Sequence, residues 1–362
     1  MKILKYIFLL IVLLSIGGSI YIATQKGDFK IVKSKVINSQ KTSAFNYIND
    51  NRNMENWYVW ENDTTDTHLI YSNKYSGVGS SYQWTGNSGK FNSTTIFAKE
   101  NDSIVQKIDF NGSISETTWK FKDTIGGTKI TCSSKGKMPF MFKISTFLNG
   151  GIEKVIGSKL EKSLANLDRS LDYELNTFSI KPNGVVIKKG GFYLQQTINC
   201  KISKLTHNFK IIIPSLIHFT KENNLQKNGN PFVLYNSYDI EKGITNVSVC
   251  IPINTRIFTS SGSDIVCKEL EAYTAYKTTL IGDYSHRDEA WKKTTNFILK
   301  SNKIPNKTIP IMEIFTVGFN VEIRPSKWET AIYIATHSNY ITKSTSDNST
   351  DENIESSEIE TK

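Results

Sequence analysis

Residues 152–175 read IEKVIGSKLEKSLANLDRSLDYEL, and this stretch decides the fold of the first half of the chain. Its large apolar residues recur every three or four positions, at Ile152, Ile156, Leu160, Leu164, Leu167, Leu171 and Leu175. That spacing places them on one face of an α-helix about 24 residues long. Charged side chains such as Glu161 and Arg169 fall on the other faces. We therefore predict a long amphipathic helix that buries its apolar stripe against another layer.

Short alternating segments, separated by turn residues, precede this helix. Strands are expected at residues 30–36, 79–85, 92–98, 103–110, 115–122 and 128–134, with a short helix at residues 42–48. Asn111-Gly112 and Gly126-Gly127 stand between consecutive segments, where hairpin turns belong. This order predicts an antiparallel sheet wrapped around one long carboxy-terminal helix, the helix-grip architecture, over residues 30–176.

Three motifs in this region resemble the SRPBCC superfamily, which includes the START domains, Bet v 1 and the polyketide cyclases. VIN at 36–38 followed by AFNYI at 44–48 is similar to the opening strand and helix of that family. DNRN at 50–53, with Trp57 and Trp60, matches its N-D-x-R-N-x-x-x-W-x-x-W segment. GVGSSYQWTGN at 77–87 matches its G-x-G-x-x-x-x-W-x-G-N strand.

The resemblance implies a cavity between sheet and helix that accepts an apolar molecule or lipid. The candidate lining residues are aromatic: Trp57, Trp60, Tyr82, Trp84, Trp119 and Phe121. Tyr82 and Trp84 share one face of a strand, and so do Trp119 and Phe121. The alternative is that these rings simply fill a hydrophobic core. Because the sequence shows no metal-ligand cluster and no nucleophile beside a base, we predict no metal, no cofactor and no catalytic residue here.

Residues 191–338 are expected to form a second domain with an internal repeat. PFVLY at 231–235 resembles PIMEIF at 310–315, and both pairs of Lys and Asn, at 221 and 223 and at 300 and 302, fit the same offset of about 79 positions. Each half is expected to hold a strand, a helix and two further strands. This predicts a pseudo-two-fold α+β domain with a ligand cleft between its halves. Residues 177–190, which hold the turn residues Pro182, Asn183, Gly184 and Gly190, are predicted to link the two domains.

The second half of this repeat resembles the GyrI-like effector-binding family, which also occurs behind AraC- and MerR-type DNA-binding domains. The likeness rests on GDY at 282–284, Ala290-Trp291, IMEIF at 311–315, and Trp328, Thr330, Ile332 and Tyr333. Two features depart from the family: Ala331 replaces its second Glu, and Ala335 stands where a Pro is usual.

The GyrI-like resemblance implies that Glu313 is a buried carboxylate that receives lipophilic cations. Tyr284, Trp291, Phe315 and Tyr333 would form an aromatic ring around it, because ring faces attract cations. A surface carboxylate is the alternative for Glu313, and core packing is the alternative for the rings. Some relatives resemble hydrolases that open strained electrophiles, in which Glu313 and Tyr284 would act as the base and its helper.

The two ends of the chain differ in character from its body. Lys2 and Lys5 precede an uncharged, mostly apolar run at residues 6–25, which is long enough to span a bilayer. Residues 1–29 are therefore an uncleaved single-pass anchor, with the body outside the cytoplasm, or a signal peptide whose cleavage releases a secreted or periplasmic protein. The acidic segment 339–362 is predicted to be disordered, because it has too few apolar residues to form a core.

Composition sets the remaining expectations. The chain carries a formal net charge of +10, but no helix-turn-helix, zinc finger or dense basic run is visible, so we predict no nucleic-acid partner. The favoured function is a membrane-tethered, non-enzymatic protein that binds hydrophobic or cationic small molecules or lipids. The alternatives are a hydrolase or cyclase acting on lipid- or polyketide-like substrates, and a transcription-related effector sensor.

Overall fold

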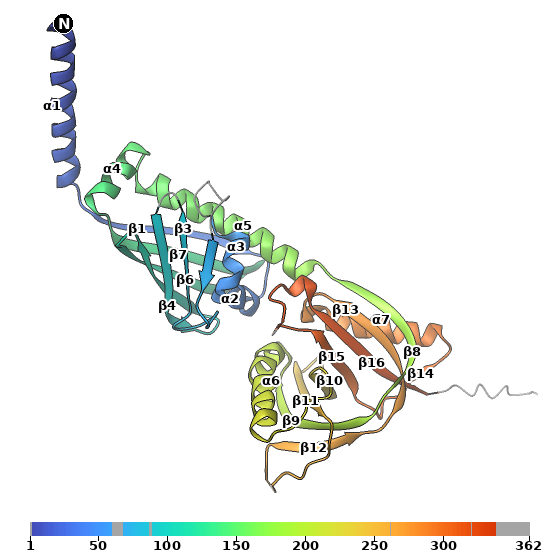
Figure 1. Cartoon of the computed structure of the whole chain (residues 1–362). Coiled ribbons are helices and arrows are strands. Elements are labelled where there is room, and N and C mark those ends of the chain that lie inside the picture. Colours follow the sequence, from blue (N-terminus) through green and yellow to red (C-terminus); the bar gives the residue numbers. More distant parts are fainter. Residues whose placement is uncertain (1, 60–67, 87–88, 261, 320, 338–362) are drawn as a thin grey trace, which may run out of the picture. The chain divides into compact units, whose positions relative to one another are not determined.

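The computed structural model describes residues 2–59, 68–86, 89–260, 262–319 and 321–337 (Figure 1). The chain divides into two compact units. Unit 1 comprises Met1–Lys181, Thr279–Ala290 and Ile314–Ala331, and unit 2 comprises Pro182–Thr278, Trp291–Glu313 and Ile332–Lys362. Trp60 and the acidic segment 339–362, for which predictions were made, lie outside the described residues.

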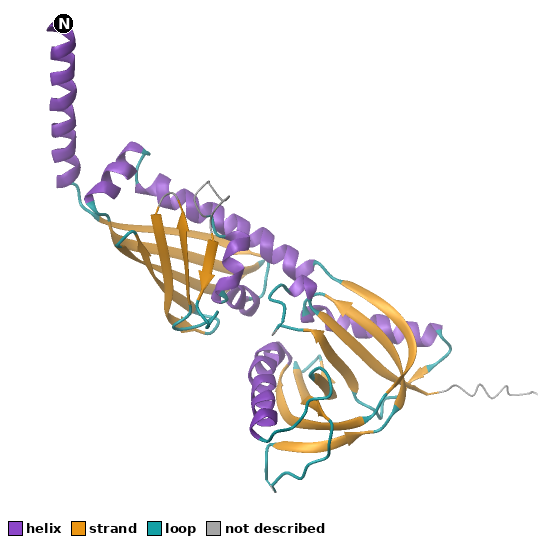
Figure 2. Cartoon of the chain, viewed as in Figure 1, coloured by secondary structure: helices purple, strands orange, loops and turns teal. Residues whose placement is uncertain are grey.

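The prediction of an α+β chain is confirmed, and the strands form two antiparallel sheets (Figure 2). In unit 1 the helices are α1 (Lys2–Thr24), α2 (Lys41–Asn49), α3 (Met54–Trp57), α4 (Phe140–Leu148) and α5 (Ser158–Asn176). The strands are β1 (Asp28–Ile37), β2 (His68–Tyr71), β3 (Ser81–Gly86), β4 (Gly89–Lys99), β5 (Ser103–Phe110), β6 (Ser113–Thr124) and β7 (Gly127–Lys137). They form a seven-stranded sheet in the order β1-β7-β6-β5-β4-β3-β2.

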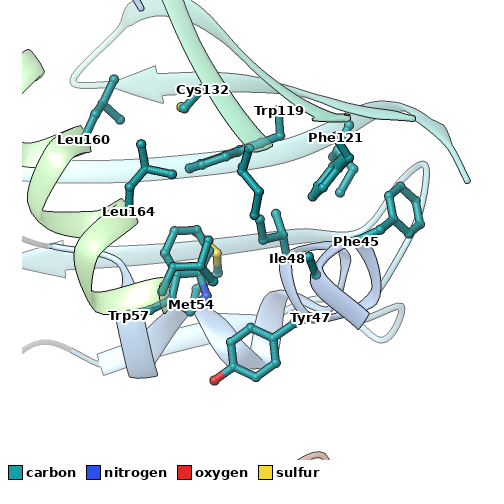
Figure 3. Packing of buried hydrophobic residues seen from close by; sticks show 14 of the residues in the cluster. Phe45, Tyr47, Ile48, Met54, Trp57, Trp119, Phe121, Cys132, Leu160 and Leu164 are labelled. Carbon is teal, nitrogen blue, oxygen red and sulfur yellow. The ribbon is translucent and has the colours of Figure 1, made fainter. Parts of the chain in front are cut away.

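The apolar stripe of α5 forms one side of the core of unit 1. Leu160, Leu164, Leu167 and Leu171 are all at most 3% exposed. Figure 3 shows Leu160 and Leu164 facing the sheet residue Trp119, with Trp57 of α3 beside them. The predicted helix is not uniform, because a π-helical turn at Glu153–Gly157 precedes α5. Burial of this stripe is what holds α5 on the sheet.

The second sheet has nine strands, and this part of the chain also holds two long helices. The strands are β8 (Ser179–Lys188), β9 (Gly191–Lys201), β10 (Phe232–Asp239), β11 (Ile244–Ile253), β12 (Ile265–Leu270), β13 (Tyr273–Ile281), β14 (Ile304–Pro305), β15 (Ile311–Val317) and β16 (Glu329–His337). The helices are α6 (Leu205–Glu222) and α7 (Arg287–Lys300). The order is β12-β9-β11-β10-β15-β16-β13-β8, and β14 pairs with β16. Strand β15 therefore has strands on both sides.

The segment 177–190, expected to be a linker, is mostly regular structure. Strand β8 occupies Ser179–Lys188 and stands last in the sheet order. Pro182 lies within it and is exposed. An edge strand has one side without a partner, so a proline whose nitrogen faces that side removes no bond from the sheet. The turn residues that suggested a linker are thus compatible with an edge strand.

Helix α1 exposes almost all of its side chains. Residues Ile3–Thr24 are long and apolar enough to cross a membrane, and a signal sequence would have the same properties. Among residues 3–24 of α1, whose side chains the structure describes, only Ile22 is buried, at 8% exposure. Helix α4 lies next to α1, and the Phe147 ring of α4 is edge-on to the Tyr21 ring of α1, with ring centres 6.4 Å apart.

Candidate functional site

Glu313 lies on β15, within the second sheet. Strand β15 reads IMEIFTV, and Glu313 is the only charged residue in it. Its side chain is 1% exposed, although carboxylates are rarely buried unless they are paired or hydrogen-bonded. The strand residues next to it are apolar, so Glu313 is a buried carboxylate in a hydrophobic strand.

Two aromatic side chains donate hydrogen bonds to the Glu313 carboxylate. The hydroxyl of Tyr235, on β10, donates to Oε2 at 2.8 Å. The indole Nε1 of Trp291, in the first turns of α7, donates to Oε1 at 2.8 Å. Hydrogen bonds to an ionised acceptor are about twice as strong as those between neutral groups. Each carboxylate oxygen therefore accepts a hydrogen bond from an aromatic side chain.

A third ring completes this arrangement, which we call the Glu313 site: Glu313, Tyr235, Tyr238 and Trp291. The ring centres of Tyr235 and Trp291 are 4.7 Å apart, with an angle of 79° between the ring planes. Those of Tyr238 and Trp291 are 4.9 Å apart, with an angle of 63°. The Tyr235 and Tyr238 rings are 5.8 Å apart at 79°. Edge-to-face packing of this kind stabilises aromatic clusters. The site thus combines a carboxylate with the ring surfaces that attract an organic cation.

The four aromatic residues predicted to surround Glu313 occupy three places. Trp291 is on the carboxylate. Tyr284 and Phe315 pack on each other in unit 1, with ring centres 5.2 Å apart, and Tyr284 also stacks on Trp328 at 4.6 Å.

Tyr333 lies beside two lysines of unit 2. The ammonium groups of Lys188 and Lys277 are 6.0 Å and 5.9 Å from the centre of its ring. Burial raises the pKa of the Tyr333 hydroxyl and lowers that of the Lys188 ammonium, because it disfavours the charged form of each. Tyr333 is thus placed to contact cations, but those cations belong to the chain itself.

Sequence analysis missed Tyr235 and Tyr238. Tyr235 is 78 positions from Glu313, so no local pattern connects the two residues. The internal repeat was the available signal, because it matches the segment that becomes β10 with the one that becomes β15. These two strands are neighbours in the sheet, and the Tyr235 hydroxyl reaches the Glu313 carboxylate across them.

The aromatic residues predicted to line a cavity in the first domain pack against other rings. Trp57 and Trp119 meet edge-on at 5.4 Å. Tyr82 and Trp84 each stack on Phe91, at 5.9 Å, and Phe121 meets Phe45 at 5.4 Å. Figure 3 shows Trp57, Trp119 and Phe121 within one cluster. The contacts observed for these rings are those of a hydrophobic core.

A row of neutral polar side chains crosses the buried face of the first sheet. Thr95, Gln106, Thr117 and Ser134 stand opposite one another on four adjacent strands, and each is at most 6% exposed. Gln106 accepts a hydrogen bond from the Trp119 indole at 3.1 Å. Burial raises the pKa of the nearby Cys132 thiol, so the thiol stays protonated at neutral pH. These four buried side chains are polar but carry no charge.

Comparison with known proteins gives structural matches alone. No family model matches the chain, and no curated protein matches it. A cryo-EM structure of an EcmrR–DNA complex in EcmrR-RPo is 13% identical, with a TM-score of 0.39, over 54% of this chain and 69% of that one. The crystal structure of the EcmrR C-terminal domain is 15% identical, with a TM-score of 0.38, over 44% of this chain and 98% of that one.

A third match is the crystal structure of protein CV1439 from Chromobacterium violaceum. It is 13% identical to this chain, with a TM-score of 0.31, over 40% of this chain and 96% of that one. All three TM-scores are below 0.5, so these likenesses do not indicate what this chain binds.

The prediction that nucleic acid is not a partner has to be corrected. It was made because the sequence shows no DNA-binding motif. One of the similar solved structures is a protein–DNA complex. The absence of a DNA-binding motif from the sequence does not by itself exclude a nucleic-acid partner. The exclusion is therefore withdrawn.

Proposed function

We propose that this protein captures lipophilic organic cations at the Glu313 site, in a GyrI-like effector-binding domain. One observation carries the proposal: Glu313 is 1% exposed, and the Tyr235 hydroxyl and the Trp291 indole each donate a hydrogen bond to its carboxylate. A buried carboxylate held this way attracts a cation by its charge, and the surrounding rings add cation–π attraction.

Stability alone gives little reason to keep this acid. Removing a carboxylate from water costs several kcal/mol, and hydrogen bonds regain only part of that cost. An apolar residue at the same place on β15 would fit the flanking Met312 and Ile314. A bound cation adds a favourable charge interaction with the carboxylate, so the charge favours the ligand-bound protein.

A ligand reaches Glu313 only when a covering side chain moves. Trp291 is the side chain that we expect to move, because it is half-buried and lies near the start of α7. Its N–H leaves Oε1, and the cation takes its place beside the carboxylate. The ring of Trp291 can then cover the ligand. Flat, delocalised cations such as rhodamines fit this exchange, since they present both charge and a ring face.

The rest of the chain fits a tethered receptor. We propose that residues 30–176 form a helix-grip domain of the SRPBCC type, in which α5 closes the seven-stranded sheet. We propose that residues 191–338 are a pseudo-two-fold domain, whose central neighbours β10 and β15 supply Tyr235 and Glu313. Helix α1 would hold both at a membrane as an uncleaved anchor.

The test compares two buried glutamates. Binding of rhodamine 6G to the purified full chain is measured by fluorescence anisotropy for the wild type, Glu313→Gln and Glu174→Gln. Glu174 is the matched control, because it is also buried, at 6% exposure, but lies on α5 of unit 1. We expect Glu313→Gln to weaken binding about 10-fold or more, about 1.4 kcal/mol, and Glu174→Gln to leave it unchanged.

Unfolding of the same variants checks that the fold survives. Glu313→Gln should be as stable as the wild type or more stable, because it removes a buried charge. The Tyr235 hydroxyl can turn to accept from the new amide, while Trp291 still donates to its oxygen. Unchanged rhodamine binding in a stable Glu313→Gln chain would show that the carboxylate is structural and that the proposed site is wrong.

A further inference from the structure

Helix α4 turns its apolar side away from the protein. Four of its large apolar side chains are exposed: Phe140 at 44%, Met141 at 73%, Phe147 at 57% and Leu148 at 76%. The residue of this helix that is buried is Thr146, at 4%. This is the reverse of a surface helix in water, which buries its apolar face and exposes its polar one.

The exposed residues form one continuous stripe. Phe140, Met141, Ile144, Phe147 and Leu148 are spaced 1, 3, 3 and 1 positions apart, which places them within about 120° of the helix circumference. Ile144, in the middle, is half-exposed. An apolar stripe of this width on a helix is typical of a surface covered by another apolar phase. The helix is followed by Gly150 and Gly151, so its nine residues stand as a separate short element.

The first sheet brings α4 to the end of the body from which α1 leaves. Strands β1 and β7 are paired with Asp28 opposite Lys137, so the start of β1 and the end of β7 meet. Helix α1 leads directly into β1, and β7 leads directly into α4. Figure 1 shows α4 beside the end of α1.

Specific contacts fasten the two helices together. The amide of Met138 donates to the Gly27 carbonyl at 2.8 Å, and Lys143 Nζ donates to the Gln25 carbonyl at 2.6 Å. The Tyr21 and Phe147 rings meet edge-on at 6.4 Å. The stripe of α4 is therefore held next to the carboxyl end of the α1 apolar segment.

We propose that α4 lies in the interface of the lipid bilayer that α1 enters, with its stripe inserted between the lipid headgroups. This inference rests on the proposed anchor role of α1. The bilayer is the occupant because the apolar surface of α1 continues into that of α4 at this place. Lys26, Lys30 and Lys137 are exposed at the same end of the sheet, where they can pair with anionic headgroups.

The tether would then have two points of attachment. A single spanning helix allows the body to swivel about its own junction, whereas an interfacial helix fixes one face of the first sheet toward the membrane. The contacts of Gly27 and Gln25 with the α4 segment would transmit that orientation to β1. The body would thus be held close to the bilayer, where lipophilic molecules concentrate.

The experiment uses the full chain in nanodiscs of phosphatidylcholine and phosphatidylglycerol. The photoreactive residue p-benzoyl-phenylalanine replaces Leu148, Ile125 or Phe8, one at a time, and lipid adducts are measured by intact mass. Ile125 is the matched control, because it is apolar and 99% exposed. It lies in the turn before β7, about 35 Å along that strand from α4. Phe8 reports separately on whether α1 lies in the bilayer.

We expect Leu148 to give lipid adducts at about the yield of Phe8, and at least about ten times that of Ile125. Adducts at Phe8 with none above the Ile125 level at Leu148 would overturn the interfacial role of α4 and leave the anchor intact. Cross-links from Leu148 to a second copy of the chain would also overturn it. If Phe8 gives no adducts, the anchor itself is wrong and the inference fails with it.

Discussion

Two buried glutamates, one in each unit, differ in the kind of group that donates to them. Glu174 accepts a hydrogen bond at 3.1 Å from the backbone amide of Ser326, which belongs to the 3-10 turn Pro325–Lys327. Glu313 accepts from the side chains of Tyr235 and Trp291. A backbone amide is fixed in its turn, whereas an aromatic side chain can rotate away. The difference suggests that Glu174 holds a structure together and that Glu313 can exchange a donor for a ligand.

The interior of the first sheet supports the same distinction. Its polar row, Thr95, Gln106, Thr117 and Ser134, contains no charge. Neutral polar groups are buried at modest cost when they hydrogen-bond, as Gln106 does with Trp119. The buried charge of Glu313 in the second sheet does not have such a low cost. We therefore expect substitutions that change charge to affect stability differently in the two sheets.

The largest effect should come from a buried charge that has no donors. Leu164 is 2% exposed on the core stripe of α5. Leu164→Arg places a guanidinium among hydrocarbon groups, and we expect it to lower the free energy of unfolding by more than about 4 kcal/mol or to abolish folding of unit 1. Circular dichroism and thermal melting of the full chain measure this.

Tyr173→Arg is the control on the same helix. Tyr173 is 60% exposed, so the new charge stays in water and should change the unfolding free energy by less than about 0.5 kcal/mol. Equal melting of the Leu164→Arg chain and the wild type would show that the stripe is not the core of unit 1.

The second effect tests Glu174 as a structural acid. Glu174→Ala leaves the Ser326 amide without its carboxylate, and Ser326 is itself only 8% exposed. We expect a loss of about 3 kcal/mol, because the variant loses a charge-assisted bond and leaves a buried donor. Rhodamine binding should be unaffected. A stable Glu174→Ala chain would remove the contrast between the two acids.

Elements were predicted correctly where the residues that specify them are neighbours in the sequence. The repeat of leucines at 160, 164, 167 and 171 is local and helical, and α5 was predicted from it. Strand β5 occupies Ser103–Phe110, the range predicted, because alternation and turn residues bound it on both sides. Helix α4 was missed. Six of its nine residues, FMFKISTFL, are apolar, so this short segment lacks the regular three- and four-residue spacing that marked α5.

The site was predicted only in part, for a similar reason. A lone acid in the apolar strand Ile311–Val317 marked Glu313, and its burial is observed. Trp291 was named through the family motif. Tyr235 and Tyr238 lie on a strand far away in sequence, and the pairing of β10 with β15 depends on the whole sheet. Tertiary pairing of this kind leaves no trace in local periodicity.

A smaller effect tests the donors of Glu313. Tyr235→Phe keeps the ring and removes the hydroxyl that donates to Oε2. We expect the unfolding free energy to fall by about 1.5 kcal/mol, since a hydrogen bond to a charged group is lost. Cation binding should be equal or tighter, because the carboxylate keeps its charge and loses a competing donor. Weaker rhodamine binding would mean that the hydroxyl itself contacts the ligand.

The smallest effect concerns an acid beside the Glu174 turn. The Arg324 guanidinium, which hydrogen-bonds the Glu322 carboxylate at 2.9 Å, lowers the pKa of Glu322 from 4.5 to about 2. Because the folded pKa is depressed, this pair contributes stability above pH 4.5, and the contribution is lost as the pH falls toward about 2.

The stability difference between the wild type and Glu322→Gln should therefore shrink across that pH window. The change should be small, because the pair is two residues apart and lies partly in water, and 1 M salt should reduce it further. Urea unfolding at pH 6, 4 and 2.5, with and without salt, measures it. A difference that stays constant over this range would show that Arg324 does not hold Glu322 in its charged form.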